Sequence, residues 1–184
     1  MRSDAQANRE RLLTVAGTVI TEQGVDASMR DIARQAGVGL ATLLRHFPTR
    51  EGLLEALLRT SFDELTARAA EVETSSPPRD ALMLWLREFV AFTTSYHGTV
   101  TLMAQAIEDP GSALHDSCVS LHAAGARLLA RAQEAGDARR DVDGGDVFAL
   151  VSALAWLGDQ AGFKARAEHL FDVVMEAVVP DRRA

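Results

Sequence analysis

The stretch that decides the fold is 28–54, SMRDIARQAGVGLATLLRHFPTREGLL. It opens on a serine, a preferred helix N-cap, and its next apolar residues recur at helical spacing, which predicts a short helix over 28–36. Gly37 ends that helix, because glycine accepts the left-handed backbone of a helix C-terminus at little cost. A second short helix is predicted over 40–46, and Pro48 ends it because the residue before a proline avoids the helical region.

Thr49 is placed to cap a third helix that begins at Arg50. Two short helices joined by a glycine turn make a helix-turn-helix, whose second helix enters the major groove of DNA. The bare pattern is a weak signal, and its alternative is an αα-corner in an ordinary helical bundle.

The residues around the turn resemble the DNA-binding domain of the TetR family of bacterial transcription regulators. The matching residues, in family order and spacing, are Arg30-Asp31-Ile32-Ala33, Ala36-Gly37-Val38, Thr42-Leu43, His46-Phe47-Pro48 and Arg50-Glu51. The resemblance implies an all-α fold of about nine helices. It also implies a DNA-binding domain over 1–52 and a ligand-binding and dimerisation domain over 53–184, where only length and helical layout match.

The resemblance implies which side chains face DNA. Arg30 is expected to reach a base edge or a phosphate and Arg50 a phosphate, because the arginine fork suits both. The recognition helix is expected to present Gly39, Leu40, Ala41, Thr42, Arg45 and His46. The chain departs from the family at Leu44, where a tyrosine usually donates its hydroxyl to a phosphate and leucine has no such donor.

Composition is that of an ordinary globular protein, with 184 residues, 47% hydrophobic and 24% charged. No apolar run approaches the ~18 residues of a transmembrane helix, so no membrane partner is expected. The polar N-terminus does not have the pattern of a signal peptide. A single cysteine, Cys118, excludes an internal disulfide and favours the reducing cytoplasm.

The net charge of −7 is unevenly distributed along the chain. Residues 1–52 hold seven arginines and six acids, whereas the remainder holds 12 basic and 20 acidic residues. An acidic body can orient a near-neutral head toward DNA phosphates, so the asymmetry matters more than the total.

Helical patterns also predict a helix over about 4–23 that braces the two short helices. From Arg50 onward they predict six helices, of which the first is the one that Thr49 caps and is shared between the two domains. They are expected over 50–73, 79–97, 99–108, 112–135, 144–161 and 165–179. The run 147–157 contains one polar residue, Ser152, and a helix that is apolar all round must be covered all round. Pairing the last two helices with their copies would give a four-helix bundle, which resembles the TetR dimer interface. The expected interface residues are Val151, Leu154, Leu170, Val173 and Val174, and the alternative is a monomer with 144–161 at its centre.

The resemblance also implies a ligand pocket within the body helices. The residues expected to line it are Trp85, Phe89, Phe92, Tyr96, Met103 and Trp156, with Cys118, His122 and Gln160 as polar anchors. Aromatic walls with few polar groups suit a small apolar organic molecule, and no cofactor or resident metal is expected. The alternative for each large side chain is plain core packing.

His115, Cys118 and His122 fall on one helix face, and imidazole and thiolate are good ligands for soft metals. A metal- or thiol-responsive regulator is therefore an alternative reading. A small helical enzyme or carrier is less favoured, because the chain has no Glu-x-x-His pair and no glycine-rich phosphate loop. The favoured function is a homodimeric repressor that a small apolar effector releases from a palindromic operator, with half-sites about 34–36 Å apart.

Overall fold

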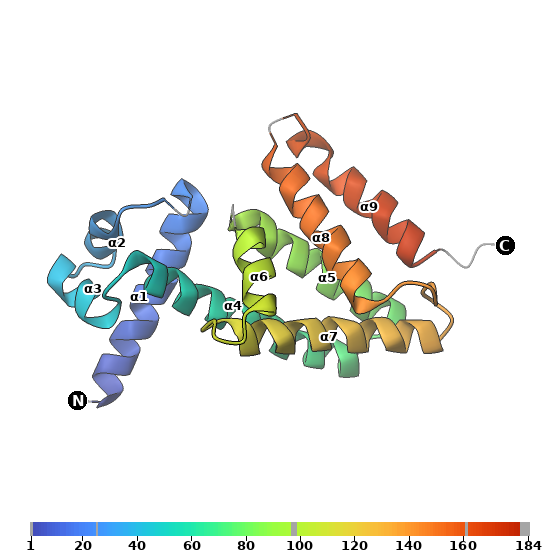
Figure 1. The fold of residues 1–184 in the computed structure, drawn as a ribbon, viewed down its shortest axis with the longest axis horizontal. Helices are drawn as coiled ribbons and strands as arrows, with labels where there is room; N and C mark the ends of the chain where they lie inside the picture. Colours follow the sequence, from blue (N-terminus) through green and yellow to red (C-terminus); the bar gives the residue numbers. More distant parts are fainter. Residues whose placement is uncertain (1, 25, 97–98, 161, 181–184) are drawn as a thin grey trace. The chain divides into compact units, whose positions relative to one another are not determined.

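The computed structural model describes residues 2–24, 26–96, 99–160 and 162–180, and within them it has nine α-helices, one 3-10 helix and no strand (Figure 1). The predicted all-α class is confirmed, and helix ends lie within three residues of their predicted places. The helices are α1 (Arg2–Gln23), α2 (Met29–Gln35), α3 (Leu40–His46), α4 (Arg50–Ser75), α5 (Pro78–Ser95), α6 (Thr99–Glu108), α7 (His115–Glu134), α8 (Gly144–Asp159) and α9 (Ala167–Val178), with the 3-10 helix η1 (Lys164–Arg166) before α9.

The chain divides into two compact units. The first, here called the head, is Met1–Ser61 with Tyr96–Gly98, and the second, the body, is Phe62–Ser95 with Thr99–Ala184. Among the described helices, none is both long and apolar enough to span a bilayer.

The head is built around one apolar core to which α1, α2, α3 and the start of α4 all contribute. Leu12 and Val19 of α1, Ile32 of α2, Leu43 of α3 and Leu53 of α4 are each at most 1% exposed. Helix α2 packs against both α1 and α3 (Figure 1). The long α1 therefore acts as the brace that holds the two short helices, which are too short to be stable alone.

The turn between α2 and α3 is closed by backbone hydrogen bonds. Gly37 has φ +66°, and its N–H donates to the carbonyl of Arg34 at 3.1 Å. The N–H of Val38 donates to the carbonyl of Ala33 at 3.0 Å, which completes a Schellman motif. At the other end of α2, the hydroxyl of Ser28 accepts from the N–H of Arg30 at 3.1 Å, as predicted for an N-cap.

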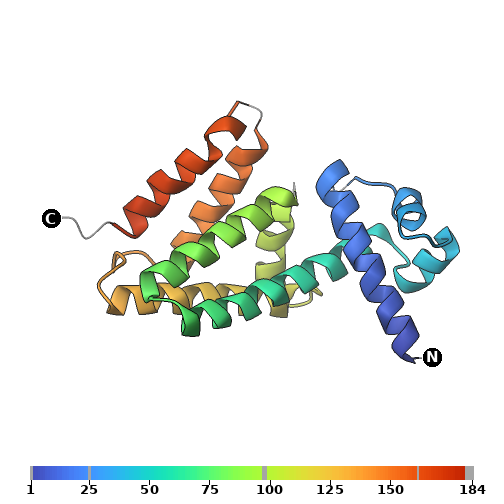
Figure 2. The same ribbon diagram turned by 180° about the vertical axis from the view of Figure 1, so that it is seen from behind.

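The body is a bundle in which α5 packs against α7 and α8, α6 against α7, and α8 against both α7 and α9 (Figures 1 and 2). Helix α5 supplies the largest buried side chains, among them Trp85 and Phe89. Helix α8 begins with a reciprocal capping box, in which Asp143 and Asp146 each accept from the other's N–H at 3.0 Å. The spacing of Asp143 and Asp146 in the sequence is that of a capping box.

Candidate functional site

The recognition helix α3 has one buried face and one open face. Leu43 is fully buried at 0% exposure and fixes the helix to the head core. Ala41 and Arg45 are exposed, Leu40 and Thr42 are half-buried, and the N-cap Gly39 is exposed with an extended backbone. These five predicted DNA-facing residues therefore share a surface that the head leaves open.

His46 differs from the other predicted DNA-facing residues, because its side chain is held by α1. Its Nε2 lies 3.3 Å from the amide nitrogen of Asn8, and the guanidinium of Arg9 lies 5.1 Å from the ring centre of the neighbouring Phe47. These contacts fasten the C-terminal end of α3 to α1. Asn8 was not singled out in the sequence, since an asparagine on an exposed helix has no distinguishing pattern.

The two predicted arginines at helix starts are both at the surface. Arg30 is exposed at the beginning of α2. Arg50, at the beginning of α4, pairs with Asp26 at 2.8 Å across the surface of the head. An exposed pair of this kind is worth only about 0.2–1 kcal/mol, so it does not prevent Arg50 from turning to a phosphate.

Leu44 is 38% exposed on α3. An exposed leucine beside Arg45 supplies apolar surface and no hydrogen-bond donor. The departure from the family pattern therefore lies on the surface of the head and leaves its core unchanged.

Three residues predicted to line the ligand pocket, Trp85, Phe89 and His122, form a packed cluster with Phe148. The ring of Trp85 stacks on that of Phe89 with centroids 5.3 Å apart, Phe89 contacts Phe148 at 4.9 Å, and Phe148 stacks on His122 at 3.3 Å. Trp85 is 0% exposed, and its Nε1–H donates to the carbonyl of Leu65 at 2.9 Å. A Cβ at Gly125 would lie 2.8 Å from the Trp85 ring, so the cluster has no spare room on that side.

Other residues predicted to line the pocket are not brought to this cluster. Tyr96 belongs to the head, where it packs against the core beside Gly17. Trp156 is 61% exposed. Gln160 donates from its side-chain amide to the carbonyl of Trp156 at 3.4 Å. The shared cavity of Trp85, Tyr96 and Trp156 stays a prediction.

Two further pocket residues are apolar packing groups of the body. Phe92 meets Phe62 edge-on, with ring centroids 5.6 Å apart, and Met103 is buried. Their predicted role in ligand binding remains a prediction, because packing and ligand contact call for the same side chains.

The predicted metal-binding set is not assembled as one. The ring Nδ1 of His115 lies 3.0 Å from the carbonyl of Ala106. Burial raises the pKa of the Cys118 thiol to about 11 and lowers the pKa of His122 to about 4, so both groups are neutral at physiological pH. Within the described part of the chain, no group of three or more His, Cys, Asp or Glu side chains is placed to hold a metal ion.

The predicted dimer residues fall into two groups. Val151 and Leu154 are 0% and 7% exposed within one chain, so both pack mainly inside the body, and their predicted part in a dimer interface stays a prediction. Val173 is 50% exposed, and Leu170 and Val174 are half-buried. The inward face of α9 is made by a different set, Phe171, Met175 and Val178.

Two families of known domains match the chain. The family described as "Bacterial regulatory proteins, tetR family" matches residues 12–57, and the family described as "Transcriptional regulator SbtR-like, C-terminal domain" matches residues 77–178, more than half of the chain. An HTH-type transcriptional regulator of Staphylococcus aureus is 28% identical over 120 residues, which cover 62% of this chain and 62% of that protein. The chain therefore spans less than two thirds of that relative.

Solved structures match over nearly the whole chain. A TetR transcriptional regulator of Streptomyces coelicolor is 34% identical, with 94% of this chain and 99% of that chain covered and a TM-score of 0.73. A TetR regulatory protein of Mycobacterium vanbaalenii is 29% identical, with 97% and 98% covered and a TM-score of 0.68. The regulator RolR, solved in complex with resorcinol, is 18% identical over 97% and 90% of the two chains with a TM-score of 0.60, and so shares the fold. The chain belongs to the TetR family of bacterial transcription regulators, non-enzymatic proteins that bind DNA and small ligands.

Proposed function

We propose that the chain acts in the cytoplasm as a homodimeric repressor, which binds a palindromic operator and leaves it when a small organic effector binds the body. The observation that carries the DNA part is the open face of α3, where the exposed Arg45 lies opposite the buried Leu43 and the half-buried Thr42 lies at the side. A helix seated by one apolar side chain and presenting polar groups on the other side is the arrangement that reads base edges.

Support for a dimer comes from the outer face of the last two helices. Trp156 and Val173 are among the most exposed large apolar side chains described, at 61% and 50%. Ala149 and Ala153 of α8 are exposed on the same helix as Trp156. A second copy of the same face would remove this apolar surface from water, and a two-fold dimer would carry two heads to a two-fold site.

Support for a small effector comes from the family and from RolR, which was solved with a small phenol, resorcinol. The effector would favour a dimer form in which the two heads no longer match successive major grooves. Its power to release the operator equals its differential affinity for the two forms, and operator binding weakens effector binding by the same factor.

The test is to select binding sites from random duplex DNA and to footprint the selected site. We expect protection of a two-fold sequence and affinity that falls steeply with salt, because phosphate contacts release counterions. Arg45→Ala should weaken the selected site by about 1–3 kcal/mol and relax preference at one base pair per half-site.

The matched control is Arg34→Ala, which removes an exposed arginine of α2 that pairs with Asp31 at 2.8 Å. That arginine lies outside the predicted reading face, so its loss should leave base preference unchanged. Absence of a protected two-fold site at low salt would refute the repressor proposal.

A further inference from the structure

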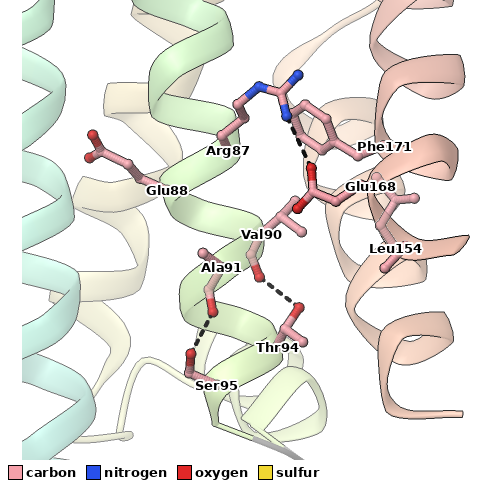
Figure 3. A pocket seen from close by; sticks show the side chains of 10 residues that line it. Arg87, Glu88, Val90, Ala91, Thr94, Ser95, Leu154, Glu168 and Phe171 are labelled. Atoms are coloured by element: carbon pink, nitrogen blue, oxygen red, sulfur yellow. Dashed lines mark hydrogen bonds and ion pairs between the residues drawn. The ribbon is translucent and has the colours of Figure 1, made fainter. Parts of the chain in front are cut away.

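A groove of about 480 Å³ opens on the body between α5, α8 and α9 (Figure 3). Its apolar walls come from Val90 and Ala91 of α5, Leu154 of α8 and Phe171 of α9. It is separate from the Trp85 cluster, none of whose rings lines it. Its volume falls in the range of sites for small organic ligands, about 300–1,000 Å³.

Among the residues that the structure describes, Arg87 is the one cation that lines the groove, and it is already neutralised. Arg87 donates to Asp172 at 2.6 Å and to Glu168 at 3.3 Å, and its guanidinium lies 4.5 Å from the ring centre of Phe171. A guanidinium held by two carboxylates offers little attraction to a further anion. The groove is therefore poorly suited to a carboxylate or phosphate ligand.

The remaining polar groups of the groove can accept hydrogen bonds but have few donors to offer. The hydroxyl of Thr94 donates to the carbonyl of Val90 at 2.8 Å, and that of Ser95 donates to the carbonyl of Ala91 at 2.8 Å, as Figure 3 shows. Each hydroxyl has thereby used its only donor and keeps lone pairs. A ligand that brings its own donors fits this set.

Glu168 is the carboxylate best placed to meet such a donor. It is 90% exposed as a side chain, and its contact with Arg87 is the longer of the two that Arg87 makes with acids. If Glu168 turns to a ligand, Asp172 still holds Arg87. The other lining acid, Glu88, is engaged by Arg68 at 3.0 and 3.1 Å.

We propose that this groove is the effector site of the regulator and that the effector is a lipophilic cation, an apolar ring system bearing an amine. The assignment of effector rests on the proposed function, whereas the binding site stands on the groove itself. The ring system would lie against Val90, Leu154 and Phe171, and the ammonium group would pair with Glu168. Since α9 forms one wall, a ligand here would act on the helix whose outer face is proposed to meet the second copy.

Direct binding to the DNA-free protein tests the site, with calorimetry on three naphthalene probes of equal size. We expect 2-(1-naphthyl)ethylamine to bind about three- to fivefold more tightly than the matching alcohol and about tenfold more tightly than the matching carboxylic acid. Glu168→Gln should remove the advantage of the amine over the alcohol. Glu176→Gln, an exposed acid of α9 outside the groove lining, should leave it intact.

A steric variant separates this groove from any other. Ala91 is exposed, so Ala91→Trp can fill the groove without disturbing the core, and it should abolish binding of the amine. Ala130→Trp, at an exposed alanine of α7, is the control. Amine binding that survives Ala91→Trp would overturn the site, as would equal or tighter binding of the acid. If the wild type does not bind the amine and Ala91→Trp changes the oligomeric state, a second copy covers the groove. That result would also overturn the ligand site.

Operator release is measured separately with the same probes. Amine binding that Ala91→Trp abolishes, but that never releases the operator, would leave the site standing and overturn its role as effector site. Release by an apolar compound that Ala91→Trp does not affect would support the proposed repressor and overturn this groove as its effector site.

Discussion

The head and the body use their exposed surfaces in opposite ways. On the head, the open face of α3 carries small and basic residues together with Leu40 and the exposed Leu44, beside a single buried anchor, Leu43. On the body, the open face of α8 and α9 carries Trp156 and Val173. A surface proposed for DNA differs in chemistry from the core beneath it, whereas a surface proposed for a second copy shares the chemistry of that core. Because the exposed and the buried apolar residues of α8 and α9 are alike in chemistry, the sequence alone does not separate them.

The largest expected effect concerns Trp85, which belongs to the core of the body. The contrast between core and surface in the body would fail if Trp85 were a pocket wall that the fold does not need. Trp85→Ala removes a fully buried ring and its hydrogen bond to the Leu65 carbonyl, so we expect a loss of about 3–5 kcal/mol in the free energy of unfolding. Urea unfolding followed by circular dichroism measures it. Leu84→Ala, on the same helix at 39% exposure, should change it by less than about 0.5 kcal/mol. A stable Trp85→Ala protein would mean that the cluster is not core.

The contrast is sharpened at the outer face of α9. Val173→Glu would place an unpaired charge in an apolar interface, and we expect the dimer dissociation constant to rise at least about a hundredfold, near 3 kcal/mol. Sedimentation velocity over a concentration series measures it. Val119→Glu, on α7 at 44% exposure, is the matched control and should leave assembly unchanged. A wild-type chain that stays monomeric at micromolar concentration would contradict the assignment.

In the head, two nearby glycines should respond differently. Gly37 has φ +66°, so Gly37→Ala forces a side chain into the left-handed region and should cost about 1–2 kcal/mol. Gly39 caps α3 with an extended backbone and open space around it, so Gly39→Ser should be neutral or slightly stabilising. Hydrogen exchange of the α2 and α3 amides measures both. Equal effects would mean that the turn does not depend on the glycine conformation.

Acid should weaken the body through one histidine. The folded-state pKa of His122 is about 4 against an ordinary 6.5, because burial disfavours its charged form. As the pH falls, the unfolded chain binds this proton at a higher pH than the folded chain does. The part of the free energy of unfolding that comes from neutral His122 is therefore complete above about pH 6.5 and is lost as the pH falls toward 4. We expect a loss of roughly 1 kcal/mol between about pH 7.5 and 5.5.

His122→Gln should remove that part of the pH dependence, and thermal unfolding at several pH values would show it. His169→Gln replaces an exposed histidine and serves as the control. A pH profile that His122→Gln leaves unchanged would mean that the ring is not held neutral by its surroundings.

Helix ends were predictable because their signals are local. Ser28 and Thr49 each accept the N–H bonds that their positions in the sequence predicted, and Gly37 takes a positive φ at the end of α2. Such signals involve residues two or three apart, so no tertiary information is needed to interpret them. The helix count and the fold class follow from them.

The faces of α8 and α9 were harder to predict, because both helices carry apolar residues on more than one side. On α9, Leu170, Val173 and Val174 form a plausible stripe, but the chain buries Phe171, Met175 and Val178 instead. On α8, Val151 and Leu154 are buried and Trp156 is exposed. Which stripe turns inward depends on the helices that each one packs against, α5 and α7 for α8 and α8 for α9, and periodicity does not describe these neighbours.

The backbone closure of the α2–α3 turn has a consequence for evolution. Gly37 and Val38 make its hydrogen bonds through main-chain groups to Arg34 and Ala33, so none depends on a side chain of the open face of α3. Fold and target preference are thereby encoded by different atoms of the same short segment. If Ala41, Thr42 and Arg45 read the operator as proposed, descendants of this sequence could exchange them and acquire a new operator while inheriting an intact head.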